Sequence, residues 1–338
     1  MDTTKAKAKQ VQFLKRVDEL LPKNTSLVME LSEILGISTD SAYRRMRTET
    51  FLSIDEIILL CDYYKISFDT FTNSDEGVVT FHYSKLESAR ENFKLYQTKI
   101  MNDLEKIYHS KEKHITYASE DIPIFHHYTH PVLAFFKMFY WMNSIMSVPE
   151  LEYEKFDVQN IDRELEEIGN KTADFYSKVP SVEIWTETTI QSTVKQIEFF
   201  WDSGKFKTRE DALKVVQSLR EEISLVQKKA EKSTKLLDKN GEAIGDEQNF
   251  QLYFSEMELT NNCVLIDLGT IKSVYLGHFT FSTMSTYSDS YCNETKKWLN
   301  IVIKISSLIS GVSEKQRYQV FRKYFKIIDE LEKSISDD

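Results

Sequence analysis

Residues 26–71 read SLVMELSEILGISTDSAYRRMRTETFLSIDEIILLCDYYKISFDTF and carry the clearest structural pattern of the chain. Leu27, Leu31 and Ile34 recur at the i, i+4, i+7 spacing that places apolar side chains on one face of a helix. Gly36 then supplies the backbone freedom that a sharp turn requires. The pattern predicts a helix that ends in a tight turn and leads directly into a second helix.

The residues after this turn predict two further helices. Ser38 is expected to cap the first of them, over residues 38–48, with Ala42 and Met46 turned inward. Ser53 is expected to open the next helix, and acidic residues in its first turn favour that start. The inward side chains of this helix are expected to be Ile54, Ile57, Ile58 and Cys61.

These landmarks resemble the Cro/repressor-like family of transcriptional regulators, also called the xenobiotic-response-element family. The match rests on the Leu-Gly-Ile-Ser run at 35–38, on Ser53-Ile54 and Ile57-Ile58, and on the closing segment 66–71. The resemblance covers roughly a fifth of the chain. It implies a five-helix helix-turn-helix domain over residues 1–73, whose recognition helix 38–48 enters the major groove of double-stranded DNA. It also implies binding as a homodimer to two half-sites.

The outer face of residues 38–48 is expected to read bases. Positions 39, 43 and 47, and positions 40 and 44, are four residues apart and therefore line one stripe of the helix. Arg44 suits guanine, Asp40 can accept from a cytosine amine, and Thr39 can contact a thymine methyl group. The residues expected to contact DNA are Ser26, Ser38, Thr39, Asp40, Tyr43, Arg44, Arg45 and Arg47. The alternative is a solvated helix face without a DNA role.

Within this set, three residues are expected to contact phosphate. Arg45 and Arg47 lie near the end of the recognition helix, and Ser26 stands at a helix start where the family often has Gln. Arg45 also occupies a position at which the family usually has an aliphatic residue or Trp, with Met46 one place later.

The acidic charge of the chain lies outside the predicted DNA-binding domain. The formal net charge is −10, but residues 1–72 hold 10 Lys/Arg and 11 Asp/Glu, a net charge of −1. The lysines near the start form a modest basic arm that either adds phosphate affinity or is merely a solvated tail. The larger, acidic part of the chain is therefore not expected to touch DNA.

The sequence carries no pattern for catalysis, a cofactor or membrane insertion. It lacks a P-loop, a G-x-G-x-x-G loop and a G-x-S-x-G elbow, so we expect neither an enzyme nor a bound cofactor. Three cysteines and the absence of a signal peptide or long apolar span predict a cytoplasmic protein. His126 and His130 have a spacing compatible with a metal ligand pair, but no third ligand is evident. Structural or surface histidines are the favoured reading, and no metal site is predicted.

Residues 84–338 are predicted to form a mainly α dimerisation or sensor domain with a small antiparallel β-meander at 250–281. Helices are expected over residues 86–108, 160–178, 181–203, 208–237, 288–310 and 313–335. Heptad spacing from Ala212 to Ala230 suits packing on another long helix, in the same chain or in a partner. A shorter heptad pattern in 86–107 suits either a dimer seam or an ordinary bundle helix.

Together these patterns predict a sequence-specific DNA-binding transcriptional regulator. The distal domain would supply dimerisation, signal sensing or both, and its effector would be an unidentified small molecule or peptide. The aromatic helix leading to Trp141 is one place where a pocket for an apolar molecule could be lined. The alternative function is a protein-interaction adaptor or antitoxin-like module whose helix-turn-helix no longer reads bases.

Overall fold

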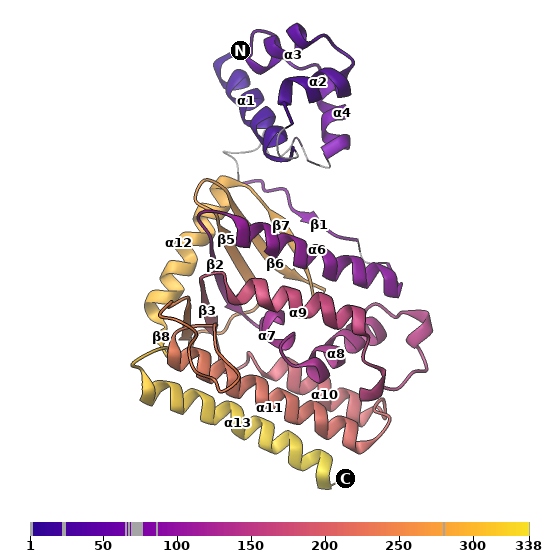
Figure 1. Cartoon of the computed structure of the whole chain (residues 1–338), viewed down its shortest axis with the longest axis vertical. Helices are drawn as coiled ribbons and strands as arrows, with labels where there is room; N and C mark the ends of the chain where they lie inside the picture. The colour runs from indigo at the N-terminus through magenta and orange to yellow at the C-terminus, as the bar shows by residue number, and fades with distance from the viewer. Residues whose placement is uncertain are drawn as a thin grey trace. The chain divides into compact units, whose positions relative to one another are not determined.

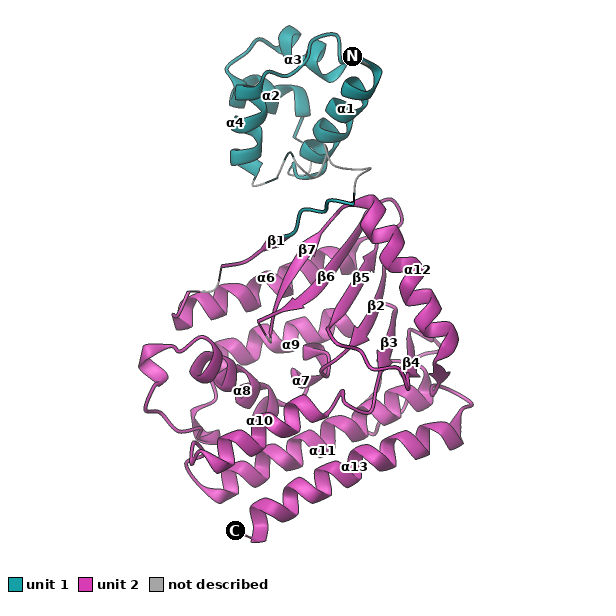
Figure 2. Ribbon diagram, turned by 180° about the vertical axis from the view of Figure 1, so that it is seen from behind, with its two compact units in different colours: residues 1–81 teal, residues 82–338 magenta. Residues whose placement is uncertain are grey.

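The computed structural model describes residues 3–21, 25–64, 66, 68, 77–85, 87–279 and 281–337. The chain forms two compact units, residues 1–81 (unit 1) and residues 82–338 (unit 2), which Figure 2 colours separately. Of the described helices, none combines the length and apolar character needed to cross a membrane.

Unit 1 is a small helical bundle (Figure 1). Its described helices are α1 (Thr3–Glu19), α2 (Leu27–Leu35), α3 (Thr39–Met46) and α4 (Ile54–Tyr64). Gly36 ends α2 in the left-handed region with φ 62°, which is why this turn favours glycine. The expected fifth helix and most of the closing segment 66–71 lie outside the described residues.

One core holds these helices together. Its buried side chains come from all four helices and the loop before α4, and are Phe13, Leu14, Val17, Leu27, Val28, Leu31, Ala42, Leu52 and Leu60. The inward orientation expected for Ile54 and Ile58 is wrong, because these side chains are 76% and 52% exposed. Leu60 takes the buried position instead, with Ile57 and Cys61 packed beside it.

The side chain of Gln10 joins α1 to the end of α3 and to the loop that follows it. Its Nε2 donates to the carbonyl oxygens of Arg45, at 2.8 Å, and Thr50, at 2.9 Å. Its Oε1 accepts from the backbone N–H of Leu52 at 2.9 Å. Because Gln10 is buried, one amide satisfies three backbone groups that water does not reach freely.

We expect Gln10→Leu to loosen this part of unit 1. Loss of the amide leaves one donor and two acceptors unpaired, at a cost of about 2 kcal/mol. Hydrogen–deuterium exchange should show faster exchange in peptides covering residues 45–52, by about tenfold or more. The exposed neighbour Gln12→Leu is the matched control. Equal exchange in the two variants would contradict the role given to Gln10.

Unit 2 is built on an eight-stranded mixed sheet in the order β1-β7-β6-β5-β2-β3-β4-β8. The strands are β1 (His82–Tyr83), β2 (His114–Ser119), β3 (Ser181–Trp185), β4 (Phe250–Phe254), β5 (Cys263–Asp267), β6 (Lys272–His278), β7 (Ser282–Thr286) and β8 (Ser307–Leu308). The β2–β3 and β3–β4 pairs are parallel, and the other pairs are antiparallel.

This sheet overturns the predicted fold class. The chain is mainly helical, but a small antiparallel meander in a helical domain was the wrong expectation, since the sheet is large and mixed. Residues 250–254 do not join the meander, because β4 pairs with β3 and β8. Residues 181–185 were expected to be helical but form β3, whose five residues are all buried. A short strand covered on both faces shows no alternation that would separate it from a buried helix.

Helices cover both faces of this sheet (Figure 1). Alone among the long helices, α12 (Asp289–Ile305) packs on one face, against apolar residues of β2, β3, β5 and β6. The other face carries α6 (Arg90–His109), α7 (Ile124–His127), α8 (Pro131–Tyr140), α9 (Arg163–Ser177), α10 (Gln191–Asp202), α11 (Arg209–Lys232) and α13 (Glu314–Asp337). A π-helical turn, Trp141–Ile145, continues α8, and short 3-10 turns lie at Pro149–Leu151 and Val158–Asn160.

The two heptad patterns pack within the chain. The apolar stripe of α11 from Ala212 to Ala230 is buried against the same core as α13, and the two helices run side by side. In the same way α6 packs along α9. Leu86, which was expected to begin the α6 pattern, lies outside the described residues.

The outer edge of β4 is closed by the chain itself. Beyond the two-residue strand β8, the Ile309 N–H donates to the Leu252 carbonyl at 2.9 Å. The Leu252 N–H in turn donates to Ser310 Oγ at 2.7 Å. At the start of the strand, the Phe250 N–H donates to the Ser233 carbonyl at 3.1 Å.

Candidate functional site

The residues expected to read bases lie on the exposed side of α3. Thr39, Asp40, Tyr43, Arg44 and Arg47 are all exposed, while Ala42 on the opposite side is fully buried. The amphipathic pattern of this short helix therefore leaves one polar side in contact with solvent.

The two arginines on this side are only loosely engaged. Arg44 Nε lies 3.9 Å from Glu49 Oε2, and the two side chains are 59% and 50% exposed. Such an exposed ion pair contributes about 0–1 kcal/mol and is readily exchanged for another anion. The Arg47 guanidinium lies 5.6 Å from the centre of the Tyr43 ring, a cation–π contact that holds both side chains on the same patch.

The two serines of the candidate set differ in what their hydroxyl groups do. Ser38 caps α3, since its Oγ accepts from the Ser41 N–H at 3.2 Å. Ser26 stands at the N-cap position of α2, but its side chain makes no capping hydrogen bond there. Because Ser26 is exposed, its hydroxyl can donate to an anion at the start of α2.

Arg45 is not on the exposed side. Its guanidinium binds Glu56 at the start of α4 through two hydrogen bonds, Nε–Oε2 at 2.9 Å and Nη2–Oε1 at 2.6 Å. The hydrogen bond from Arg45 is the main reason that the pKa of Glu56 lies below its ordinary value. This pairing neutralises the charge of Arg45 between α3 and α4.

Glu56 also completes the cap of α4. Its Oε2 accepts from the Ser53 N–H at 2.9 Å, and the Ser53 Oγ accepts from the Glu56 N–H at 3.2 Å. This reciprocal arrangement is a capping box. One carboxylate therefore starts α4 and fixes the orientation of α3.

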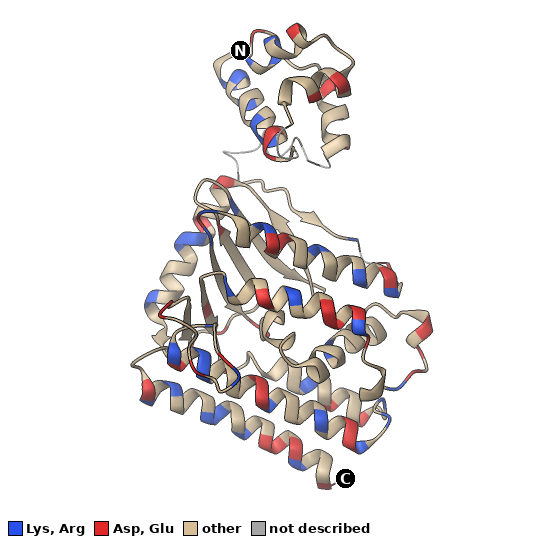
Figure 3. Ribbon diagram, viewed as in Figure 1, with Lys and Arg blue, Asp and Glu red and all other residues tan. Residues whose placement is uncertain are grey.

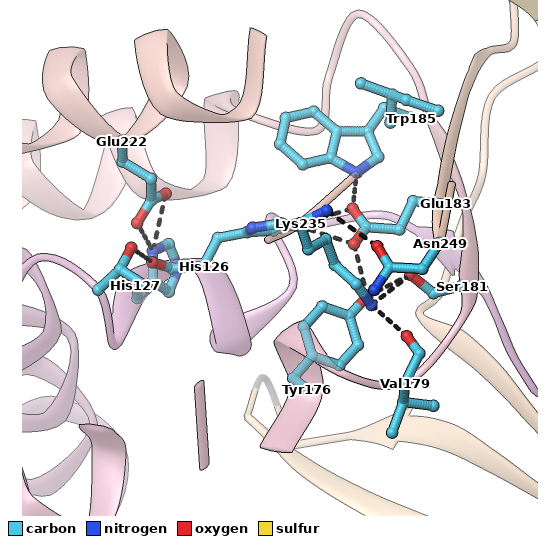
Figure 4. A network of polar contacts seen from close by, with 12 residues as sticks. His126, His127, Tyr176, Val179, Ser181, Glu183, Trp185, Glu222, Lys235 and Asn249 are labelled. Carbon is cyan, nitrogen blue, oxygen red and sulfur yellow. Dashed lines mark hydrogen bonds and ion pairs between the residues drawn. The ribbon is translucent and has the colours of Figure 1, made fainter. Parts of the chain in front are cut away.

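Unit 2 contains a second constellation, which sequence reasoning missed (Figure 4). Glu183 of β3 is fully buried and accepts from three side chains. The donors are His126 Nε2 at 2.9 Å, the Tyr176 hydroxyl at 2.5 Å and Trp185 Nε1 at 2.8 Å. Burial alone would raise the pKa of Glu183, but its donors and the nearby Lys235 hold that pKa below its usual range.

A second buried histidine–glutamate pair and a buried lysine belong to the same cluster. His127 Nδ1 lies 2.9 Å from Glu222 Oε2, and both residues are buried. Lys235 donates to the Val179 carbonyl at 2.5 Å and to Ser181 Oγ at 2.8 Å, as Figure 4 shows. Burial lowers the pKa of Lys235 well below its ordinary value. In the sequence, this cluster was indicated only by the single charged residue, Glu183, within the apolar run SVEIW.

The cluster pairs one ring nitrogen of each buried histidine, and His126 Nδ1 and His127 Nε2 have no hydrogen-bond partner among the described residues. His126 and His127 each bind a different glutamate, and His130 Nδ1 contacts the Thr129 hydroxyl at 2.9 Å. Among the described residues, no group of three or more His, Cys, Asp or Glu side chains could hold a metal ion. His126 and His130 therefore contact different partners, Glu183 and Thr129.

Comparisons with known proteins leave the function to be argued from the site. No family model, curated protein or solved structure matched the chain.

We expect Glu183→Gln to destabilise unit 2 by about 3 kcal/mol, because three donors would then compete for one amide oxygen. Thermal unfolding followed by circular dichroism measures this loss of stability. The exposed Glu167→Gln is the matched control and should unfold like the parent chain. An unchanged unfolding midpoint in Glu183→Gln would remove the central role given to this carboxylate.

The buried histidine should make stability depend on pH. Burial lowers the pKa of His126 below its ordinary 6.5. The unfolded chain therefore takes up a proton at a pH where the folded chain does not, and the free energy of unfolding falls as the pH drops below about 6.5. His126→Gln keeps a donor for Glu183 but cannot be protonated. Its stability should fall less steeply between pH 6.5 and 5, by up to about 1.4 kcal/mol per pH unit.

Proposed function

We propose that the protein is a sequence-specific DNA-binding transcriptional regulator that places α3 of unit 1 in the major groove. The observation that carries this proposal is the exposed side of α3, where Thr39, Tyr43 and Arg44 stand free of the core. Arg44 is well suited to a guanine edge, and Arg47 and Ser26 to phosphate.

Rigidity of the reading helix also supports the proposal. Gln10 holds the end of α3 through the Arg45 carbonyl, and the Arg45 side chain ties the helix to Glu56. A helix fixed on both sides loses little conformational freedom when it enters a groove, so more of the contact energy appears as affinity. In this proposal Arg45 orients α3 and does not contact DNA.

Unit 2 has the charge pattern of a region that stays away from DNA. Residues 73–338 hold 33 Lys/Arg and 42 Asp/Glu, a net charge of −9, and Figure 3 shows charges of both signs mixed along the helices. We assign it dimerisation, effector binding or both, in a cytoplasmic protein without catalytic activity. A homodimer would bring two copies of α3 to half-sites about one helical turn apart.

The test is selection of bound sequences from random DNA, followed by affinity measurements on the selected site. Arg44→Ala should lose about 1–3 kcal/mol of binding free energy and relax the preference at one base pair. Arg47→Ala should weaken binding to all sequences and lower the salt dependence by about one phosphate contact. The matched control is Arg322→Ala, an exposed arginine on α13 of unit 2.

Two outcomes would overturn the proposal. One is a selection that enriches no sequence at any salt concentration. The other is an Arg44→Ala variant that binds the selected site like the parent chain. Arg45→Ala separates reading from folding, since it should weaken binding only to the extent that unit 1 loses stability.

A second candidate function is a protein-interaction module, and the exposed apolar residues of α4 favour it. Ile54 is 76% exposed, Tyr63 62% and Ile58 52%. Exposed apolar residues gathered on one helix are typical of a protein contact. Ile58→Glu should then abolish partner binding or dimerisation in light-scattering measurements, whereas Arg44→Glu should have no effect on it.

A further inference from the structure

Unit 2 contains an apolar cavity between α6 and the sheet. Its volume is about 140 Å³, and its walls include Leu104 and Ile107 of α6, Ile115 of β2 and Ile266 of β5. Close-packed protein interiors keep few voids larger than one water molecule. An apolar cavity of about 150 Å³ is large enough to bind benzene. The cavity therefore has room for a molecule built around one ring.

One hydroxyl that lines this cavity has no hydrogen-bond partner among the described residues. Tyr117 of β2 is 8% exposed, lines the cavity, and its hydroxyl makes no hydrogen bond with the described residues. Burial raises the pKa of Tyr117, so the group stays neutral and keeps its proton. A bound molecule would remove this hydroxyl from water, so a molecule that offers it a polar atom is favoured over one that leaves it unpaired.

Aromatic side chains in contact with one another form another part of the cavity wall. Trp141 begins the π-helical turn after α8 and stacks on Phe281, with ring centres 5.3 Å apart and planes inclined by 20°. The Tyr96 hydroxyl of α6 donates to the Phe281 carbonyl at 3.0 Å. Trp141, Phe281 and Tyr96 all line the cavity. Flat aromatic walls favour a flat guest.

The charged groups around the cavity select against an anion. Asp121 lines it but is neutralised by Lys137 at 3.1 Å. Asp103 also lines it, and its pairing with Lys106 is a 3.4 Å contact on the surface. A carboxylate in the cavity would meet Asp103 without a cation of its own.

We propose that this cavity binds a neutral, single-ring aromatic molecule whose hydrogen-bonding group meets the Tyr117 hydroxyl. The site lies wholly within unit 2, so the proposal does not depend on DNA binding by unit 1. A molecule of this class is a natural effector for the distal region, although binding itself is the property to be tested.

The test titrates the full chain with three probes by calorimetry: acetophenone, ethylbenzene and benzoate. Acetophenone should bind most tightly, because it fills the cavity and offers a carbonyl oxygen to Tyr117. Ethylbenzene has a similar shape without the carbonyl and should bind about three- to tenfold more weakly. Benzoate should not bind measurably.

Tyr117→Phe is the decisive variant, since it keeps the ring and removes only the unpaired hydroxyl. Its affinity for acetophenone should fall about three- to tenfold, to the level of ethylbenzene. Its affinity for ethylbenzene and its melting temperature should not fall. A hydroxyl with a merely structural role would lower the melting temperature and leave the ratio of the two affinities unchanged.

A second variant tests the cavity itself. Val264 pairs with Tyr117 across β2 and β5 and also lines the cavity, so Val264→Phe should fill it and abolish binding of both neutral probes. If this variant does not fold, the comparison of Tyr117→Phe with the parent chain still tests the proposal. The proposal is overturned if the parent chain binds neither neutral probe, if benzoate binds as well as acetophenone, or if Tyr117→Phe binds acetophenone unchanged.

Discussion

A carboxylate buried in the central sheet sets the arrangement of unit 2. Glu183 lies where water cannot solvate it, so donors must reach it from α7, α9 and β3 itself. Each donor brings its own element into position. Because Tyr176 fixes the end of α9, and α6 packs along α9, the position of α6 over the sheet follows from the same requirement. The cavity beneath α6 is therefore bounded by a helix whose neighbour, α9, is held to Glu183.

Unit 1 solves a similar problem with fewer residues. A short helix such as α3 buries little apolar surface of its own, with Ala42 as its one fully buried side chain. Polar side chains supply what packing does not. Gln10 and Glu56 hold α3 from two sides. The side chains of Arg44 and Tyr43 make only exposed contacts with nearby residues. One set of side chains thus holds the helix in place, and another set on the same helix faces solvent.

The sequence predicted local features better than long-range ones. Gly36, the Ser38 cap and the stripe of α2 followed from rules that act within a few residues, and the long helices followed from their period. The strand β3 could not be recognised, because a run buried on both faces carries no period. Arg45 was assigned to phosphate because its partner, Glu56, lies 11 positions away and on another helix. The contacts of Gln10 and Glu183 were missed for the same reason, because most of their partners are distant in sequence. A single polar residue does not show in the sequence whether its side chain will be buried.

The closed edge of β4 has a consequence for assembly. An open strand offers a row of backbone donors and acceptors to any extended peptide, and many domains recruit partners by adding such a strand. Here Ile309, Ser310 and Ser233 already occupy the groups of Leu252 and Phe250 that would form that ladder. A partner strand therefore cannot pair with β4, and the edges of the sheet are the two-residue strands β1 and β8. Strands this short offer few backbone donors and acceptors to an incoming peptide, so the sheet presents little template for edge-to-edge association.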